Sequence, residues 1–187
     1  MKKKNIVLGI SSSISAYKAC DIANLLQKEG HSVQAVMTAN ACQFITPFTL
    51  QTLTKQPVYT DMFELKDEME VKHISIAQKA DLILVAPATA NIIGKVANGI
   101  ADDALSTVIM ARRQTTSCLI APAMNNEMYN NPIVQHNIEK LKSFGYKFID
   151  PKVGRLACGG APQIGALANV DDIVQQVICV LEKQESR

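Results

Sequence analysis

The stretch "DLILVAPATAN", residues 81–91, decides the fold of this chain. Its first part, Asp81–Ala88, is a nearly continuous apolar run, as expected for a strand that is covered on both faces in a parallel sheet. Pro87 cannot donate a hydrogen bond to a neighbouring strand, so the strand ends here. Thr89 and Asn91 then form a polar turn that leads into a helical pattern. The stretch therefore predicts an α/β fold, in which buried parallel strands alternate with helices.

The same alternation extends along the rest of the chain. We expect further strands over Asn5–Ile10, Ser32–Thr38, Ser117–Met124 and Tyr146–Asp150. We expect helices over Ser15–Glu29, Asn40–Thr54 with a bend near Pro47, His73–Ala80, Asn91–Ala111, Pro132–Phe144 and Val170–Lys183. This pattern predicts one Rossmann-like domain over residues 1–187, with a doubly wound parallel sheet between two layers of helices. Its core would run over about residues 5–183 and leave a short C-terminal tail.

The composition limits the class of protein. Of the 187 residues, 48% are apolar and 19% are charged, and the formal net charge is +2. These values are ordinary for a globular protein and argue against a dedicated nucleic-acid binder. No apolar run reaches the roughly 18 residues of a membrane span. The cysteines are scattered, without C-x-x-C or zinc spacing, so we expect reduced thiols, no metal site, no membrane partner and a cytoplasmic location.

The residues directly after the strands are the candidates for function, because ligands of such sheets bind beyond the carboxyl ends of the strands. The first strand is followed by "SSSIS", Ser11–Ser15, where hydroxyls and backbone amides at a helix N-terminus would suit one phosphate group. Helix capping by serine is the alternative, and it is the commoner role. The dinucleotide fingerprint G-x-G-x-x-G is absent, since only Gly9 lies nearby, so a bound nucleotide would be a mononucleotide.

Two of the expected strands end in the same tripeptide, Ala-Pro-Ala. The two segments are "APATAN", residues 86–91, and "APAMNNEMYNNP", residues 121–132. Both place polar residues at the same edge of the sheet, which predicts a shared pocket. The amide of Asn125 could bind a carboxylate or a carbonyl group. Helix capping is the alternative for the asparagines, and we expect it for Asn91 more than for Asn125.

One histidine and one cysteine stand out by their position. His73 opens the helix that leads into the strand over residues 81–88, although a lone histidine is more often a surface or packing residue. Cys158 lies in "GRLACGG", residues 154–160, where the glycines predict a mobile loop. We assign the other cysteines to packing: Cys20, Cys42, Cys118 and Cys179.

Four segments together resemble the homo-oligomeric flavin-containing cysteine decarboxylase family, from about Asn5 to about Ile173. They are "GISSSISAYKA", "VKHISIAQKADLILVAPATANIIGKVANGIADDALS", "LIAPAMNNEMYNNP" and "GRLACGG". The resemblance implies a flavodoxin-like fold, an FMN cofactor and a homotrimer or a dodecamer of trimers with the active site at subunit contacts. It implies the following site residues: Ser11, Ser12, Ser13, Thr38, Phe44, Thr89, Ala90 and Asn91 for FMN; Ala123, Met124 and Asn125 for the substrate; His73 and Cys158 for catalysis.

The resemblance also implies a reaction, the decarboxylation of phosphopantothenoylcysteine to 4′-phosphopantetheine in coenzyme A biosynthesis. A cysteine carboxylate has no electron sink of its own. In this family FMN first oxidises the cysteinyl side chain, carbon dioxide leaves, and the resulting enethiol is reduced again. Cys158 would supply the proton for the last step from a loop that closes over the substrate.

One departure concerns the segment after Cys158. The family usually carries Glu-Pro where this chain has Asn169–Val170, and the spacing after Cys158 is one residue longer. Two alternatives share the expected fold. A flavin prenyltransferase would need neither P-A-M-N nor the A-C-G cysteine. A non-catalytic FMN-binding regulatory protein often has an extended acidic tail, whereas this chain ends in the short and mixed "EKQESR".

Overall fold

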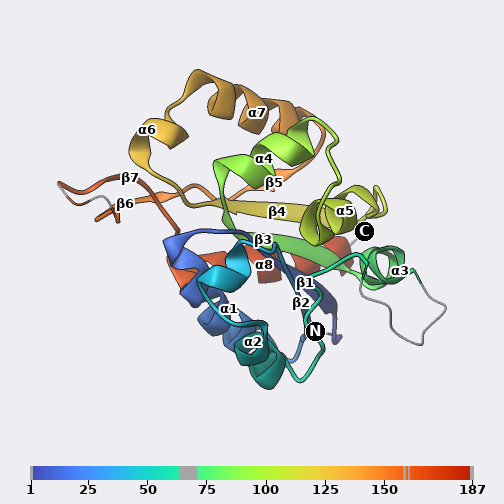
Figure 1. Cartoon of the computed structure of the whole chain (residues 1–187). Coiled ribbons are helices and arrows are strands. Elements are labelled where there is room, and N and C mark those ends of the chain that lie inside the picture. The colour runs from blue at the N-terminus through green and yellow to red at the C-terminus, as the bar shows by residue number, and fades with distance from the viewer. Residues whose placement is uncertain (1, 64–70, 158, 160, 186–187) are drawn as a thin grey trace.

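A five-stranded parallel sheet forms the centre of the structure. The computed structural model of the chain describes residues 2–63, 71–157, 159 and 161–185 (Figure 1). Within these residues the strand order is β2-β1-β3-β4-β5, and every neighbouring pair is parallel. This arrangement confirms the predicted flavodoxin-like, doubly wound fold. The strands are β1 (Asn5–Ile10), β2 (Ser32–Met37), β3 (Leu82–Ala88), β4 (Ser117–Pro122) and β5 (Lys147–Phe148).

Strand β3 occupies the middle of the sheet, as its apolar sequence predicts. All of its residues are buried. It pairs with β1 on one side, where Ile6 lies opposite Leu82, and with β4 on the other, where Leu84 lies opposite Leu119. A strand that is hydrogen-bonded on both edges and covered on both faces has no polar side to show, which explains its continuous apolar run.

Helices cover both faces of the sheet and enclose an apolar core on each (Figure 1). Side chains of β1 alternate between the two cores: Ile6 and Leu8 face one, and Val7 faces the other. The first core is closed by α1 (Lys18–Lys28), α2 (Pro47–Thr54) and α8 (Val170–Glu185). The second is closed by α3 (Lys72–Lys79), α4 (Ala90–Ala97), α5 (Ala104–Met110) and α7 (Pro132–Ser143).

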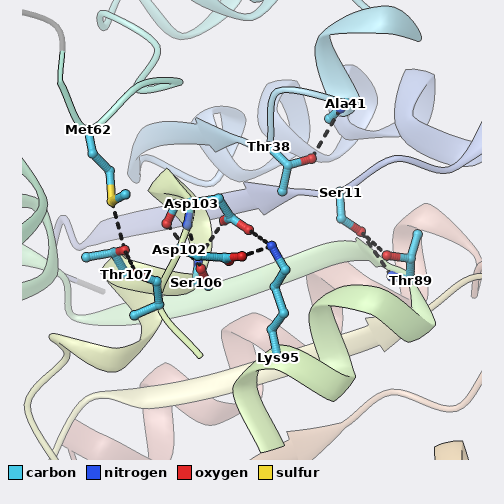
Figure 2. A network of polar contacts seen from close by, with 11 residues as sticks. Ser11, Thr38, Ala41, Met62, Thr89, Lys95, Asp102, Asp103, Ser106 and Thr107 are labelled. Carbon is cyan, nitrogen blue, oxygen red and sulfur yellow. Dashed lines mark hydrogen bonds and ion pairs between the residues drawn. The ribbon is translucent and has the colours of Figure 1, made fainter. Parts of the chain in front are cut away.

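The helix predicted over Asn91–Ala111 is wrong in one respect, because the chain forms two helices there, α4 and α5. Gly99 has a φ of +69°, which ends α4 in the left-handed region that favours glycine. Asp103 then begins α5 with a capping box, in which its side chain accepts from the Ser106 N–H at 2.9 Å. Lys95 joins the two helices through ion pairs of 2.6 Å with both Asp102 and Asp103 (Figure 2).

Two strands and one helical turn have no counterpart among the predicted elements, and two predicted helices begin with a 3₁₀ segment. Strands β6 (Lys152–Gly154) and β7 (Gln163–Ala166) form an antiparallel hairpin, and α6 (Asn126–Tyr129) is a single turn after β4. Short 3₁₀ segments, η1 (Ile14–Tyr17) and η2 (Ala41–Gln43), precede α1 and α2. The expected break near Pro47 is confirmed, because Pro47 is the first residue of α2.

A buried histidine lies at the amino edge of the sheet. His31 is only 4% exposed, and its Nδ1 accepts from the backbone N–H of Lys4 at 3.4 Å. Its Nε2 is buried without a hydrogen-bond partner among the described residues. Burial lowers the pKa of His31, an effect that the nearby Glu29 and Glu185 carboxylates oppose and Lys4 reinforces. The imidazole is therefore held in its neutral form.

We predict that His31 makes the fold sensitive to mild acid. A histidine whose pKa is lowered on folding binds a proton more readily in the unfolded chain, so stability is lost as the pH falls below about 6.5. The urea midpoint of the wild type should fall between pH 7.5 and pH 5.5, and that of His31→Leu should fall much less. Replacing the exposed His136 by Leu is the matched control and should leave the wild-type pH dependence in place. An equal pH dependence in the wild type and His31→Leu would contradict the prediction.

Candidate functional site

A hollow of about 850 Å³ lies at the carboxyl edge of the sheet. The segments after β1, β3 and β4 form its floor, and the β6–β7 hairpin forms one wall. Its volume is in the range of small-molecule sites, and its place is the one expected for ligands of such sheets. The predicted residues that line this hollow are Ser12, Ser13, Phe44, Thr89, Asn91, Ala123, Met124 and Asn125.

The loop after β1 offers hydroxyl groups at the beginning of a helical segment. Ser13 caps η1, and its Oγ accepts from the Ser15 N–H at 3.2 Å. The capping interpretation of this loop is therefore confirmed for Ser13. Ser12 is half-buried, lines the hollow and makes no side-chain hydrogen bond with the described residues. The loop thus keeps a hydroxyl and a helix N-terminus directed to the hollow, which suits an anion such as a phosphate.

Ser11 and Thr89 join the loops after β1 and β3 (Figure 2). Ser11 is only 2% exposed, and its Oγ donates to the carbonyl oxygen of Pro87 at 2.8 Å. The backbone N–H of Thr89 donates to the same Oγ at 3.0 Å. Thr89 lines the hollow, whereas Ser11 does not. The hydroxyl of Ser11 is therefore used inside the protein.

Three other predicted residues also lie away from the lining of the hollow. Thr38 is 8% exposed, and its Oγ1 accepts from the Ala41 N–H at 3.2 Å, at the start of η2. Ala90 begins α4 but does not line the hollow. His73 is half-buried on α3, which Figure 1 shows on the side of the molecule away from α6 and the hairpin. Within one chain, His73 and the hollow are apart.

The two asparagines have roles opposite to the expected ones. Asn91 lies inside the first turn of α4, whose N-cap is Thr89, so its expected capping role is wrong. Asn125 is the N-cap of α6, and its Oδ1 accepts from the Glu127 N–H at 2.8 Å. Capping fixes the orientation of the Asn125 side chain where it lines the hollow. Both residues remain at the hollow, so the shared pocket predicted from the repeated Ala-Pro-Ala segments is present.

The hairpin contributes a wall that the sequence did not predict. Met124 donates its N–H to the carbonyl oxygen of Gly165 at 2.9 Å, which joins β7 to the loop after β4. A Cβ atom at Gly165 would lie 2.3 Å from the Met124 oxygen, so only glycine permits this approach. Cys158 lies outside the described residues, between Ala157, which lines the hollow, and Gly159. The hairpin residues at the hollow are Arg155, Leu156, Ala157, Gly165 and Ala166.

Some lining residues could have been found from the sequence. Ile14, Ser15, Tyr17 and Lys18 continue the serine-rich loop, and Met128 belongs to the segment after the second Ala-Pro-Ala. For the hairpin residues, the only indication in the sequence was the group of glycines around Cys158.

The chemistry of the lining fits a flavin mononucleotide. Apolar side chains, among them Ile14, Phe44 and Met124, offer apolar contacts for an aromatic ring system, and the serine loop offers donors for a phosphate. The described residues contain no group of three or more His, Cys, Asp or Glu side chains that could hold a metal ion. Across the same residues, none of the helices has both the length and the apolar character needed to cross a membrane.

The thiols of Cys20, Cys42 and Cys118 are held in their protonated form. Burial raises the pKa of all three, and that of the fully buried Cys118 reaches about 12. Since the thiolate is the reactive species, burial makes these cysteines poor nucleophiles. Their environment agrees with the packing role expected from the sequence.

Comparison with known sequences gives a family match over most of the chain. The model described as Flavoprotein matches residues 1–182. The bifunctional coenzyme A biosynthesis protein CoaBC of Borreliella burgdorferi is 49% identical over 177 residues, which are 95% of this chain and 44% of that protein. A probable phosphopantothenoylcysteine decarboxylase of Streptococcus mutans is 47% identical over 174 residues, 93% of this chain and 97% of that protein. The chain thus spans less than half of the bifunctional relative and nearly all of the Streptococcus protein.

Solved structures with the same fold cover the whole described architecture. A PPC decarboxylase variant with a cysteine-to-serine substitution, complexed with pantothenoylaminoethenethiol, has a TM-score of 0.89 and 31% identity, over 97% of this chain and 100% of that one. The FMN binding protein AtHal3 has a TM-score of 0.86 and 31% identity, over 97% and 98% of the two chains. With the family model matching nearly every residue, the chain belongs to the flavoprotein family.

Proposed function

We propose that this chain is an FMN-dependent phosphopantothenoylcysteine decarboxylase, which converts its substrate to 4′-phosphopantetheine and carbon dioxide. One observation carries the proposal: the serine loop, the turn after β3 and the Ala123–Asn125 segment line one hollow at the carboxyl edge of the sheet. The Streptococcus relative, with nearly the same extent as this chain, bears the name of this activity. The neighbour AtHal3 is described as FMN binding, which supports the cofactor.

The cofactor would lie along the floor of the hollow. Ser12 and Ser13, with the backbone amides at the start of η1, would hold its phosphate. Thr89, Asn91 and Phe44 would contact the ring system. When bound, FMN supplies the electron sink that a cysteine carboxylate lacks. The protein binds and orients the cofactor and keeps water away from it.

The substrate would bind between the cofactor and the hairpin. Asn125, fixed by its capping bond, would hold the substrate carboxylate, with Met124 and Ala123 beside it. The hairpin would cover the substrate, because Leu156 and Ala157 face the hollow from its wall. Cys158 would donate its Sγ proton to the substrate carbon that must be protonated after carbon dioxide has left.

We further propose that the active site is completed by a second copy of the chain, in a homotrimer. His73 does not line the hollow of its own chain, so a catalytic His73 would have to come from a neighbour. Exposed apolar side chains lie in both regions that would meet: Val71 and Ile74 beside His73, and Ile14 and Tyr17 at the hollow. A contact between two different surfaces of one chain is heterologous, and it closes into a three-membered ring when successive subunits are rotated by a third of a turn.

Turnover tests the proposal directly. The purified chain with FMN and phosphopantothenoylcysteine is expected to release carbon dioxide and form 4′-phosphopantetheine, followed by mass spectrometry, and to show the visible absorption of bound flavin. Binding of FMN without turnover would instead support a non-catalytic FMN-binding protein. Attachment of a prenyl group to the flavin would support a flavin prenyltransferase.

Cys158→Ser should separate decarboxylation from the final reduction. Because a serine hydroxyl is a much weaker acid than a thiol, this variant should still release carbon dioxide but accumulate the enethiol. A pantothenoyl enethiol is the ligand in the cysteine-to-serine variant of the neighbouring PPC decarboxylase structure. Mass spectrometry distinguishes the enethiol from the reduced product by two hydrogen atoms. Cys179→Ser, in α8, is the control and should give the normal product. Normal product from Cys158→Ser would exclude Cys158 as the acid.

His73→Asn should lower the turnover number by about 100-fold or more, as expected when an acid–base or positioning group at the reacting atoms is removed. FMN content should stay that of the wild type, because none of the residues proposed to hold FMN is changed. If neighbouring chains share the site, unfolding and refolding a mixture of His73→Asn and Cys158→Ser subunits should restore part of the activity. Mixed assemblies that stay inactive would show that His73 and Cys158 act within the same chain, and full activity of His73→Asn would exclude a catalytic role.

A further inference from the structure

A single buried hydroxyl joins the two loops that line the floor of the hollow. Ser11 follows the last residue of β1, and four contacts tie it to Pro87 and Thr89 at the end of β3. Figure 2 shows those with Thr89. Its N–H and its Oγ both approach the carbonyl oxygen of Pro87, at 3.2 and 2.8 Å. Its Oγ also accepts from the Thr89 N–H at 3.0 Å and lies 3.2 Å from the Thr89 Oγ1. These contacts bridge segments 76 and 78 residues apart in the sequence.

These bonds form where the regular ladder between β1 and β3 has stopped. The last paired residues of the two strands are Gly9 and Val85. Pro87 has no N–H to donate, so beyond this point β3 offers a carbonyl oxygen and lacks a donor. Ser11 supplies donors to that oxygen and an acceptor for the N–H of Thr89. The serine therefore extends the connection between the strands into the loops.

The hydrogen-bonding capacity of Ser11 is used by these contacts. A hydroxyl has one donor and two acceptor sites. The hydroxyl donates to the Pro87 oxygen, with the Thr89 Oγ1 as a second acceptor at 3.2 Å, and the Thr89 N–H takes an acceptor site. Ser11 is 2% exposed and does not line the hollow, in contrast to Ser12 and Ser13. A ligand in the hollow would meet the neighbours of Ser11 and not its hydroxyl.

We propose that Ser11 is a positioning residue for the flavin, which sets the separation between the phosphate-binding loop and the ring-binding loop. Ser12 and Ser13 follow it directly on one side, and Thr89 and Asn91 lie on the other. The phosphate and the ring system of FMN lie at opposite ends of a ribityl chain. Both ends bind well only if the two loops keep a fixed spacing. The inference rests on the proposed flavin cofactor.

Affinity for two flavins distinguishes positioning from direct contact. FMN and riboflavin, which lacks the phosphate, are titrated into apoprotein while quenching of flavin fluorescence is followed. Ser11→Ala should weaken the binding of both flavins by a similar factor of about tenfold, the effect expected when buried hydrogen-bonding groups lose their partner. Ser12→Ala, which removes a proposed phosphate contact, should weaken the binding of FMN much more than the binding of riboflavin. Ser143→Ala, in α7, is a surface control and should change neither affinity.

The outcomes separate three roles of Ser11. If Ser11→Ala lowers the affinity for FMN but not for riboflavin, Ser11 is a direct phosphate ligand and the inference is overturned. A lower melting temperature with both affinities unchanged would make it a residue of stability alone, which also overturns it. If Ser11→Ala does not fold, Ser11→Cys keeps a weak donor of similar shape and is compared in the same way. A wild-type protein that binds neither flavin would overturn the proposed cofactor and this inference together.

Discussion

The missing N–H groups of two prolines shape the functional edge of this protein. Pro87 and Pro122 lie at the ends of β3 and β4, where a regular ladder would require a donor. Bonds outside the regular ladder continue the connections here: the Ser11 Oγ donates to the carbonyl oxygen of Pro87 at 2.8 Å, and the Ala123 N–H donates to that of Ala88 at 2.9 Å. The chain therefore leaves the sheet at fixed points. Two of the polar segments that line the hollow, those after β3 and β4, start from these points.

A site built in this way draws on segments far apart in the sequence. Each segment has its own local anchor, such as the capping bond of Asn125 or the close approach of Gly165 to Met124. The parallel sheet brings the anchors to one edge. The loops themselves need little internal structure, because their spacing comes from the strands and from bonds between the loops such as those of Ser11. This division explains why short polar turns can form a hollow large enough for a cofactor and a substrate.

The sequence predicted what depends on local pattern and missed what depends on tertiary contact. Strand β3 was predictable because burial on both faces leaves a continuous apolar run. The division of residues 91–111 was missed because Gly99 and the capping box at Asp103 interrupt an otherwise regular helical pattern. The hairpin was missed because β6 and β7 are short, and the position of β7 depends on Gly165 meeting Met124. His73 precedes β3 in the sequence, at the end of the strand opposite to the hollow, and topology alone could have shown this separation.

The separation of the apolar interior into two layers has a consequence for protein engineering. Successive side chains of β1 belong to different cores, as Ile6 and Val7 do, and the strand backbones lie between the cores. Side chains without shared neighbours contribute independently to stability, whereas those in direct contact are coupled. The change in unfolding free energy caused by two substitutions on opposite faces of this sheet should therefore equal the sum of the two single changes. Two substitutions within one layer must be measured together. Each face can thus be redesigned as a separate unit around an unchanged cofactor edge.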